Sequence, residues 1–206
     1  MIEKKKHSIK EDFSTLALLT MPIAVAVNFV GSQIHHALSL PLFLDTIGTF
    51  FVSMLCGPWV GALTGLIGSL VNGITNPSGI PFALTSISVG LVAGFLARAK
   101  MFDTWWKIVI SIVLTSLVST IVSAPIAVLV YGGVTSSTDS LFAATLMASG
   151  VNIWKAVIGT SLLFTCIDRI IAIVVTRLII KVIPARNLIK YSLGNNYVKN
   201  STSKTA

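Results

Sequence analysis

Long apolar runs, separated by short polar or Gly- and Pro-containing breaks, constrain this chain more than any other feature. A membrane-spanning helix needs about 20 predominantly apolar residues. Six segments follow this pattern, although the second is short: residues 14–35, 45–55, 59–74, 81–97, 105–131 and 152–183. Only 11% of the residues are charged, against about 25% in soluble domains. The expected fold class is therefore an all-α integral membrane protein, a compact bundle of six transmembrane helices.

The distribution of basic residues predicts the orientation of this bundle. Cytoplasmic segments beside membrane helices carry an excess of Lys and Arg. With the N-terminus inside, all but two of the 15 basic residues fall on inside segments; the exceptions are Lys155, in an outside connection, and Arg169, within the last span. We therefore expect a multi-pass cell-membrane protein with both termini in the cytoplasm. Residues 1–190 are expected to form one six-helix transmembrane domain, to which the residues discussed below assign substrate binding, and residues 191–206 a polar cytoplasmic tail.

Sequence motifs of catalysis and cofactor binding are missing. No G-x-x-x-x-G-K-[S/T] run is present, so the sequence lacks the phosphate-binding loop of that ATPase class. The nearest match to the G-x-S-G turn of a membrane serine protease is M-A-S-G at 147–150, which lacks the first glycine. Cys56 and Cys166 have no metal-ligand spacing to a partner and are expected to act as small apolar side chains. We expect no enzyme activity, no cofactor and no metal site.

Polar and aromatic side chains gather at the outer ends of the expected spans. A pocket with a few polar groups and aromatic walls is typical of small-ligand binding. The candidate ligand-binding residues are His35, His36, Asn72, Asn76, Tyr131, Asp139, Asn152, Trp154 and Lys155. Each one alone also suits a solvated loop or an aromatic belt at the membrane surface. The connection 132–150 is long enough to be a functional loop or a lid.

Small residues recur four apart in several spans, a spacing that lets membrane helices approach closely. They favour either packing within the bundle or a docking face for a partner membrane protein. The candidate docking residues are Ala17, Thr20, Ala24, Gly57, Gly61 and Gly65.

Three charged residues within or beside the spans need their own explanation. Asp45 precedes the second apolar run, where an Asp is expected to cap a helix. Asp168 and Arg169 lie inside the last span, and adjacent helical residues point about 100° apart, so they need not pair with each other. Either neighbouring helices satisfy these two charges, or they contact a coupling partner or a substrate.

Four sequence stretches carry a resemblance to a known family. They are L-P-L-F-L-D-T-I-G-T-F-F at 40–51, C-G-P-W-V-G-A-L-T-G at 56–65, G-G-V-T-S-S-T-D at 132–139 and I-D-R-I-I-A at 167–172. The pattern, over about residues 15–190, resembles the substrate-binding S components of energy-coupling factor (ECF) vitamin transporters.

This resemblance implies a division of labour between subunits. The S component captures a water-soluble vitamin from outside, in a pocket of the first outer loop, the loop between spans five and six, and spans four to six. It docks on a transmembrane scaffold (T) subunit joined to two cytoplasmic ATPases and delivers its ligand inward. The family's A-x-x-x-A docking motif is imperfect here, because Ala17 is followed by Met21 and Thr20 by Ala24.

The resemblance is nearest to the hydroxymethylpyrimidine and pyridoxine branch, with cobalamin as the next candidate ligand. Two other functions stay open. A self-sufficient small-molecule carrier would drive uptake without partners. A membrane sensor or scaffold module would be expected to carry a cytoplasmic signalling domain.

Overall fold

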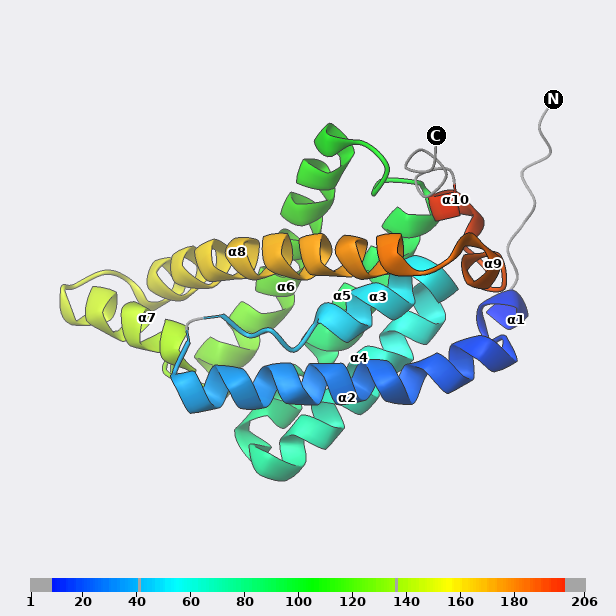
Figure 1. Ribbon diagram of the computed structural model, residues 1–206. Coiled ribbons are helices and arrows are strands. Elements are labelled where there is room, and N and C mark those ends of the chain that lie inside the picture. The colour runs from blue at the N-terminus through cyan, green and yellow to red at the C-terminus, as the bar shows by residue number, and fades with distance from the viewer. Residues whose placement is uncertain (1–8, 41, 136, 199–206) are drawn as a thin grey trace.

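The computed structural model describes residues 9–40, 42–135 and 137–198, and all regular secondary structure in these residues is helical. Figure 1 shows the arrangement. The helices are α1 (Ile9–Asp12), α2 (Thr15–Leu38), α3 (Ile47–Cys56), α4 (Pro58–Thr75), η1 (Pro77–Phe82), α5 (Ala83–Arg98), α6 (Trp105–Tyr131), α7 (Thr138–Ala148), α8 (Ile153–Val182), α9 (Ala185–Leu188) and α10 (Asn195–Val198).

Three segments of the described residues are long and apolar enough to cross a membrane: α2, the combined Pro77–Arg98 segment, and α6. The chain is therefore a helical membrane protein. Each of the six segments expected to span is helical over nearly the expected residues. The helix α3 has only 10 residues, too few to cross a bilayer alone. A count of six spans therefore stays a prediction, as does the inside location of both ends.

The ends of α2 follow from local chemistry. Ser14 caps its start, because its side-chain oxygen accepts a hydrogen bond from the Ala17 backbone N–H at 3.2 Å. Ser39 ends it in a left-handed conformation with φ 49°, as is common just past a helix C-terminus. The chain then runs back toward the middle of the bundle before α3 begins (Figure 1). Of this returning segment, residues 39–46, the part that matters is 42–46, because Phe43, Asp45 and Thr46 line the site described below.

The small residues predicted as a docking face pack inside the bundle. Residues 17, 20, 24, 57, 61 and 65 are all buried. A Cβ on Gly48 would overlap the Ala24 carbonyl, and one on Gly65 would overlap the Ser86 backbone. Buried small residues bring helices of this chain together, which is what the packing alternative predicts. A docking surface on these residues stays a prediction.

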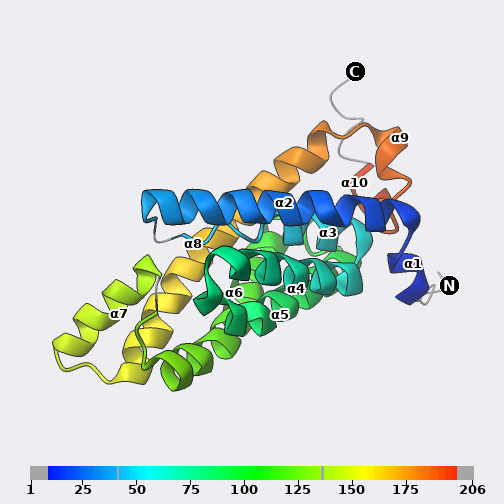
Figure 2. The same cartoon turned by 90° about the horizontal axis from the view of Figure 1, so that it is seen from below.

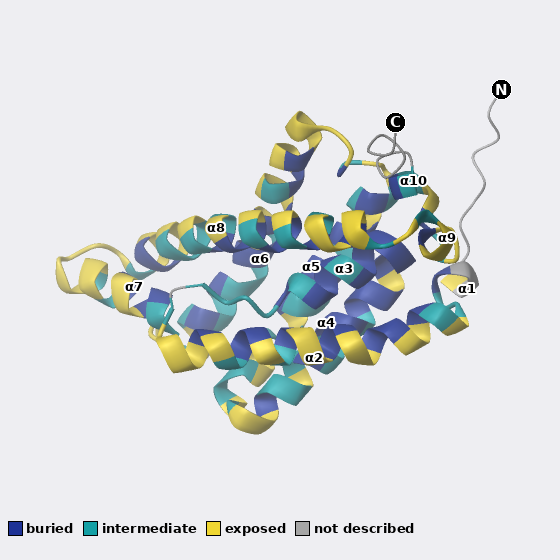
Figure 3. Cartoon of the chain, in the orientation of Figure 1, coloured by how far each residue is buried: buried dark blue, intermediate teal, exposed yellow. Residues whose placement is uncertain are grey.

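The apolar surface that remains available lies on the outward faces of the helices. In Figure 3 exposed residues run along the outer sides of α2 and α8, and buried residues face inward. On α2 the exposed side chains include Leu19, Ile23 and Val30. In a membrane protein such faces contact lipid or another membrane subunit.

The contact between α4 and α5 gives a stability prediction. A Cβ on Gly90 would overlap the Gly61 carbonyl, and the Ser53 hydroxyl donates to the Gly90 carbonyl at 3.1 Å in the same contact. We expect Gly90→Ala to lower the free energy of unfolding by about 1–3 kcal/mol, because added volume in a packed interface forces helices apart. Gly159→Ala is the matched control, since that helical glycine has no atom near a built Cβ. Unfolding in detergent measures both, and equal stability of the two variants would contradict the close contact.

Residues 191–198 are packed against the bundle and do not form a free tail. The Leu193 N–H donates to the Leu55 carbonyl at 2.9 Å, and the Ser192 hydroxyl donates to the Cys56 carbonyl at 2.9 Å. Tyr197 is buried, and burial raises the pKa of its hydroxyl, so it stays protonated at neutral pH. The predicted domain boundary at 190 therefore falls inside a packed segment. Of the expected tail, residues 199–206 lie outside the described residues.

A buried ion pair fastens the N-terminal segment at the same end of the bundle. Asp12 is fully buried, and its carboxylate accepts hydrogen bonds from Arg98 Nη2 at 2.7 and 2.6 Å. Figure 1 shows α1 and α10 together at one end of the molecule and α7 at the opposite end.

Candidate functional site

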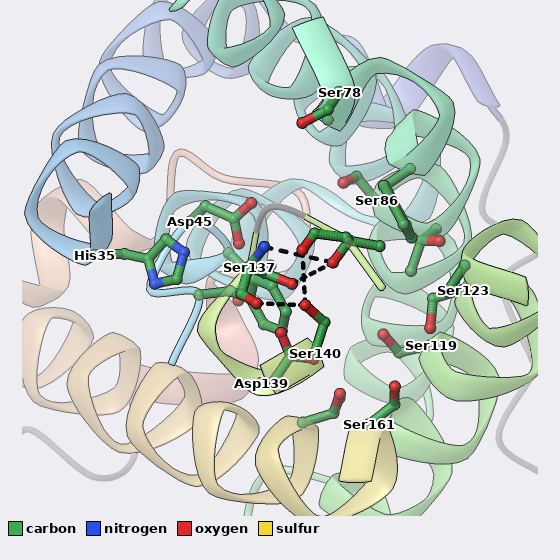
Figure 4. A pocket seen from close by; sticks show the side chains of 18 of the residues that line it. His35, Asp45, Ser78, Ser86, Ser119, Ser123, Ser137, Asp139, Ser140 and Ser161 are labelled. Carbon is green, nitrogen blue, oxygen red and sulfur yellow. Dashed lines mark hydrogen bonds between the residues drawn. The ribbon is translucent and has the colours of Figure 1, made fainter. Parts of the chain in front are cut away.

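A cavity of about 180 Å³ lies among the helices, toward the end of the bundle where α7 sits. Its wall includes residues of α2, α4, η1, α5, α6, α7 and α8, together with the returning segment 39–46. Figure 4 shows the lining side chains, which are mainly hydroxyl-bearing. Phe43 and Phe82 are the aromatic side chains of the lining. A concave site with convergent polar groups and a few apolar walls is the usual form of a small-molecule site.

The buried pair Asp168 and Arg169 lies at one edge of this cavity. The two side chains are only 1% and 4% exposed. Arg169 Nη1 donates to Asp168 Oδ2 at 3.0 Å and to the Thr46 hydroxyl at 2.7 Å. The Leu44 backbone N–H donates to Asp168 Oδ1 at 2.9 Å. This pair therefore anchors the returning segment to α8. Asp168 and Arg169 are adjacent in the sequence and need not have paired with each other, but they do.

Arg169 also contacts two further helices. Its Nη2 donates to the Ser119 hydroxyl on α6 at 3.3 Å, and its guanidinium lies over the Phe50 ring of α3 at 5.6 Å from the centroid. Arg169 also lines the cavity. A single cation thus joins α3, α6, α8 and the returning segment around the site.

Several buried polar atoms at the cavity have no hydrogen-bond partner among the described residues. They are His35 Nδ1, Asn72 Oδ1, Thr85 Oγ1, Asp139 Oδ1 and Arg169 Nε. A buried polar atom left without a partner costs about 1–3 kcal/mol. Their gathering around one cavity indicates that a polar molecule, or water in its place, completes their hydrogen bonds.

Five of the nine predicted ligand-binding residues line the cavity: His35, His36, Asn72, Asn76 and Asp139. They come from α2, α4, the residue that follows α4, and α7. The structure thus brings together side chains that are more than a hundred positions apart in the sequence, such as His35 and Asp139.

Tyr131 does not line the cavity but supports its wall. Its hydroxyl donates to the Ser78 carbonyl at 2.6 Å, and its ring stacks on Phe82 with centroids 5.9 Å apart. It therefore positions η1, which contributes Ser78 and Phe82 to the lining.

The three remaining predicted residues, at the start of α8, are not in the lining. Asn152 caps that helix, accepting a hydrogen bond from the Trp154 N–H at 2.9 Å. Trp154 and Lys155 are exposed. This arrangement does not support a place for these three residues in a ligand pocket, because they are exposed at the start of α8 and do not line the cavity.

Asp45 has a different role from the predicted one. Thr46 occupies the position before α3, and no side chain caps that helix. Asp45 instead lines the cavity, and Figure 4 shows it on the same side as His35. The expectation that Asp45 caps the second apolar segment is wrong, and Asp45 and Arg169 are site residues that sequence reasoning did not place here.

The connection 132–150 forms a cover over the cavity and is mostly helical. Helix α7 begins at Thr138 and contributes Asp139, Ser140 and Ala143 to the lining. Figures 1 and 2 both show it beside the first part of α8. The Thr138 hydroxyl donates to the Ser39 carbonyl at 3.2 Å, which links the cover to the end of α2. The expected loop is thus a helical cover between short turns.

Comparison with known proteins gives one match. The family model described as "ECF transporter, substrate-specific component" matches residues 16–180, well over half of the chain. No curated protein and no solved structure matches. The matched range contains every residue of the cavity wall.

Proposed function

The chain belongs to the family of ECF transporter substrate-specific components, and on that premise we propose that it captures a small water-soluble vitamin or vitamin precursor in the cavity beneath α7. Members of this family are transport subunits rather than enzymes. The observation that carries the proposal is the set of unpartnered buried polar atoms around the cavity. A water-soluble ligand would complete their hydrogen bonds.

The size of the cavity favours a single-ring ligand. A cavity of about 180 Å³ is below the usual 300–1,000 Å³ of drug-sized pockets. Pyridoxine and hydroxymethylpyrimidine are single heteroaromatic rings with hydroxyl groups. Cobalamin is several times larger and would require the helices to separate. We therefore favour the pyridoxine or hydroxymethylpyrimidine class and place cobalamin behind it.

The wall chemistry supports the same class of ligand. Phe82 and Phe43 offer ring faces to a heteroaromatic ring. Asn72, Thr85 and His35 offer hydrogen bonds to its substituents from three different helices.

The proposed partners are a transmembrane scaffold subunit and two cytoplasmic ATPase subunits, as membership of the family implies. We propose a plasma-membrane location with both termini cytoplasmic. In support, the basic residues concentrate on the segments assigned to the inside, and α1 and α10 share the end of the bundle opposite α7 (Figure 1).

Uptake into liposomes tests this proposal. We expect ligand accumulation only when the chain is reconstituted with its scaffold and ATPase subunits and ATP is present on the ATPase side. The chain alone should bind ligand without accumulating it, because it lacks the phosphate-binding loop that ATP hydrolysis requires in such ATPases.

The ligand for that assay is found by mass spectrometry of small molecules that co-purify with the chain, followed by calorimetry with pyridoxine, hydroxymethylpyrimidine and cobalamin. Ion-driven accumulation by the chain alone would instead establish the self-sufficient carrier. Absence of binding to every vitamin tested would contradict the proposal.

A further inference from the structure

The charges that face the cavity do not balance. Five titratable side chains of the described residues line it: His35, His36, Asp45, Asp139 and Arg169. The single strong cation, Arg169, is already paired with Asp168 behind the wall at 3.0 Å. The carboxylates of Asp45 and Asp139 face the cavity without an ion pair among the described residues.

These carboxylates belong to a preformed binding site. Asp139 is only 8% exposed, yet its Oδ1 has no hydrogen-bond partner among the described residues. His35 is 5% exposed, and its Nδ1 is also unpartnered. Figure 4 shows His35 and Asp45 on one side of the cavity, with Ser86, Ser119 and Ser123 on the other. An oxygen of an ionised carboxylate can only accept, so Asp139 Oδ1 requires a donor from outside the described residues.

The hydroxyl groups of the wall add further acceptors. Ser69 donates to the Ser86 hydroxyl at 2.7 Å, Ser140 to the Thr135 carbonyl at 2.7 Å, and Thr160 to the Ala156 carbonyl at 2.8 Å. A hydroxyl has a single proton. These three side chains have therefore already used theirs, and can only accept a hydrogen bond from a ligand. Asn72 Oδ1, which is also unpartnered, adds another acceptor to the wall.

From these carboxylates without an ion pair, and resting on the proposed function, we infer that the captured ligand is a small organic molecule that presents a protonated nitrogen, which Asp45 and Asp139 bind. A carboxylate stabilises a cation by charge-assisted hydrogen bonds and forms no such bond with an anion. The same pair of carboxylates repels an anionic vitamin, so the site selects by charge as well as by size.

Two probes of nearly the same shape separate charge from size. Pyridoxamine carries a protonated aminomethyl group at pH 7, and 4-pyridoxic acid carries a carboxylate on the same ring. Pantothenate extends the panel as a second anion. Binding of each to the purified chain is measured by calorimetry in detergent at one ionic strength, since screening weakens charge selectivity.

We expect pyridoxamine to bind at least a hundredfold more tightly than either anion. Asp45→Asn and Asp139→Asn should each weaken cation binding by about ten- to a hundredfold, the usual effect of losing a charged hydrogen bond. Asp103→Asn removes the same charge from an exposed position between α5 and α6 and should change nothing. The ratio of cation to anion affinity within one variant does not depend on how much of that variant is folded.

Two results would overturn the inference while leaving vitamin capture intact. One is tighter binding of either anion than of pyridoxamine. The other is an unchanged cation-to-anion ratio in both Asp variants. If no vitamin binds at all, the proposed function fails, and the inference fails with it.

Discussion

Arg169→Met is expected to lower the free energy of unfolding by about 3–5 kcal/mol, the usual cost of removing one partner from a buried ion pair. The Asp168 carboxylate would stay in place with the Leu44 N–H, at 2.9 Å, and the Thr46 hydroxyl, at 3.4 Å. Its negative charge would have no cation, and a charge inside a membrane bundle is costly without one. The returning segment and α6 would also lose contacts with the guanidinium.

Two further variants make this prediction specific to the pair. Lys181→Met removes a positive charge from the same helix at an exposed position, and should change the stability by less than about 0.5 kcal/mol. Adding Asp168→Asn to Arg169→Met removes the uncompensated charge while keeping an oxygen that can accept from Leu44. We expect this double variant to recover part of the loss, as a coupled pair does.

Reversible unfolding in mixed detergent, followed by tryptophan fluorescence, gives these free energies. A loss below about 1 kcal/mol for Arg169→Met would mean that water reaches the pair. That result would contradict the burial on which the wall of the cavity depends.

Ser123→Trp is expected to abolish ligand binding, with a loss of at least a hundredfold in affinity. Ser123 lies on α6 and lines the cavity, and an indole ring would occupy much of a space of about 180 Å³. The loss follows because the ligand and the ring cannot fill one volume, and interiors have little room to expand.

Ile121→Trp is the matched control for that variant. It introduces the same side chain two residues earlier on α6, at a position that is 67% exposed, where the ring would contact lipid. We expect its affinity to equal that of the unchanged chain. Calorimetry with the co-purified ligand measures both variants, and retention of binding by Ser123→Trp would show that the ligand lies elsewhere.

The positions of the long helices could be predicted from the sequence, because apolar runs and their breaks are local properties. The segment 105–131 coincides with α6, and 152–183 differs from α8 by one residue at each end. Helix α7 was not predicted, because the polar run before it resembles a loop and its 11 residues carry no strong periodicity. The packed segment 191–198 was missed for a similar reason, since its few apolar residues are buried only by tertiary contacts.

The site could be predicted only in part, because the sequence does not show in which direction each side chain points. Trp154 and Lys155 are close to the site along the chain, but successive helical residues point about 100° apart, and these two point outward. Asp45 precedes a helix and therefore resembles a cap, yet the course of the returning segment turns it toward the cavity. Arg169 pairs with its own neighbour because a long side chain can bend back to it.

The clustering of polar residues at the outer ends of the expected spans predicted the site better than any single residue did. His35, Asn72 and Asp139 are on three helices and far apart in the sequence, and all three line one cavity. The spacing of small residues predicted a docking surface less well, because the same spacing occurs in packing within a bundle and in docking to a partner. Here Gly61 and Gly65 are buried within the bundle itself.

An experimental structure of the chain with its co-purified ligand tests most directly whether this cavity is the capture site. We expect the ligand in the space beneath α7, in contact with Asp45 and Asp139, with its ring beside Phe82. A ligand bound on the outer face of α2, or at the end of the bundle where α1 and α10 lie, would contradict that conclusion.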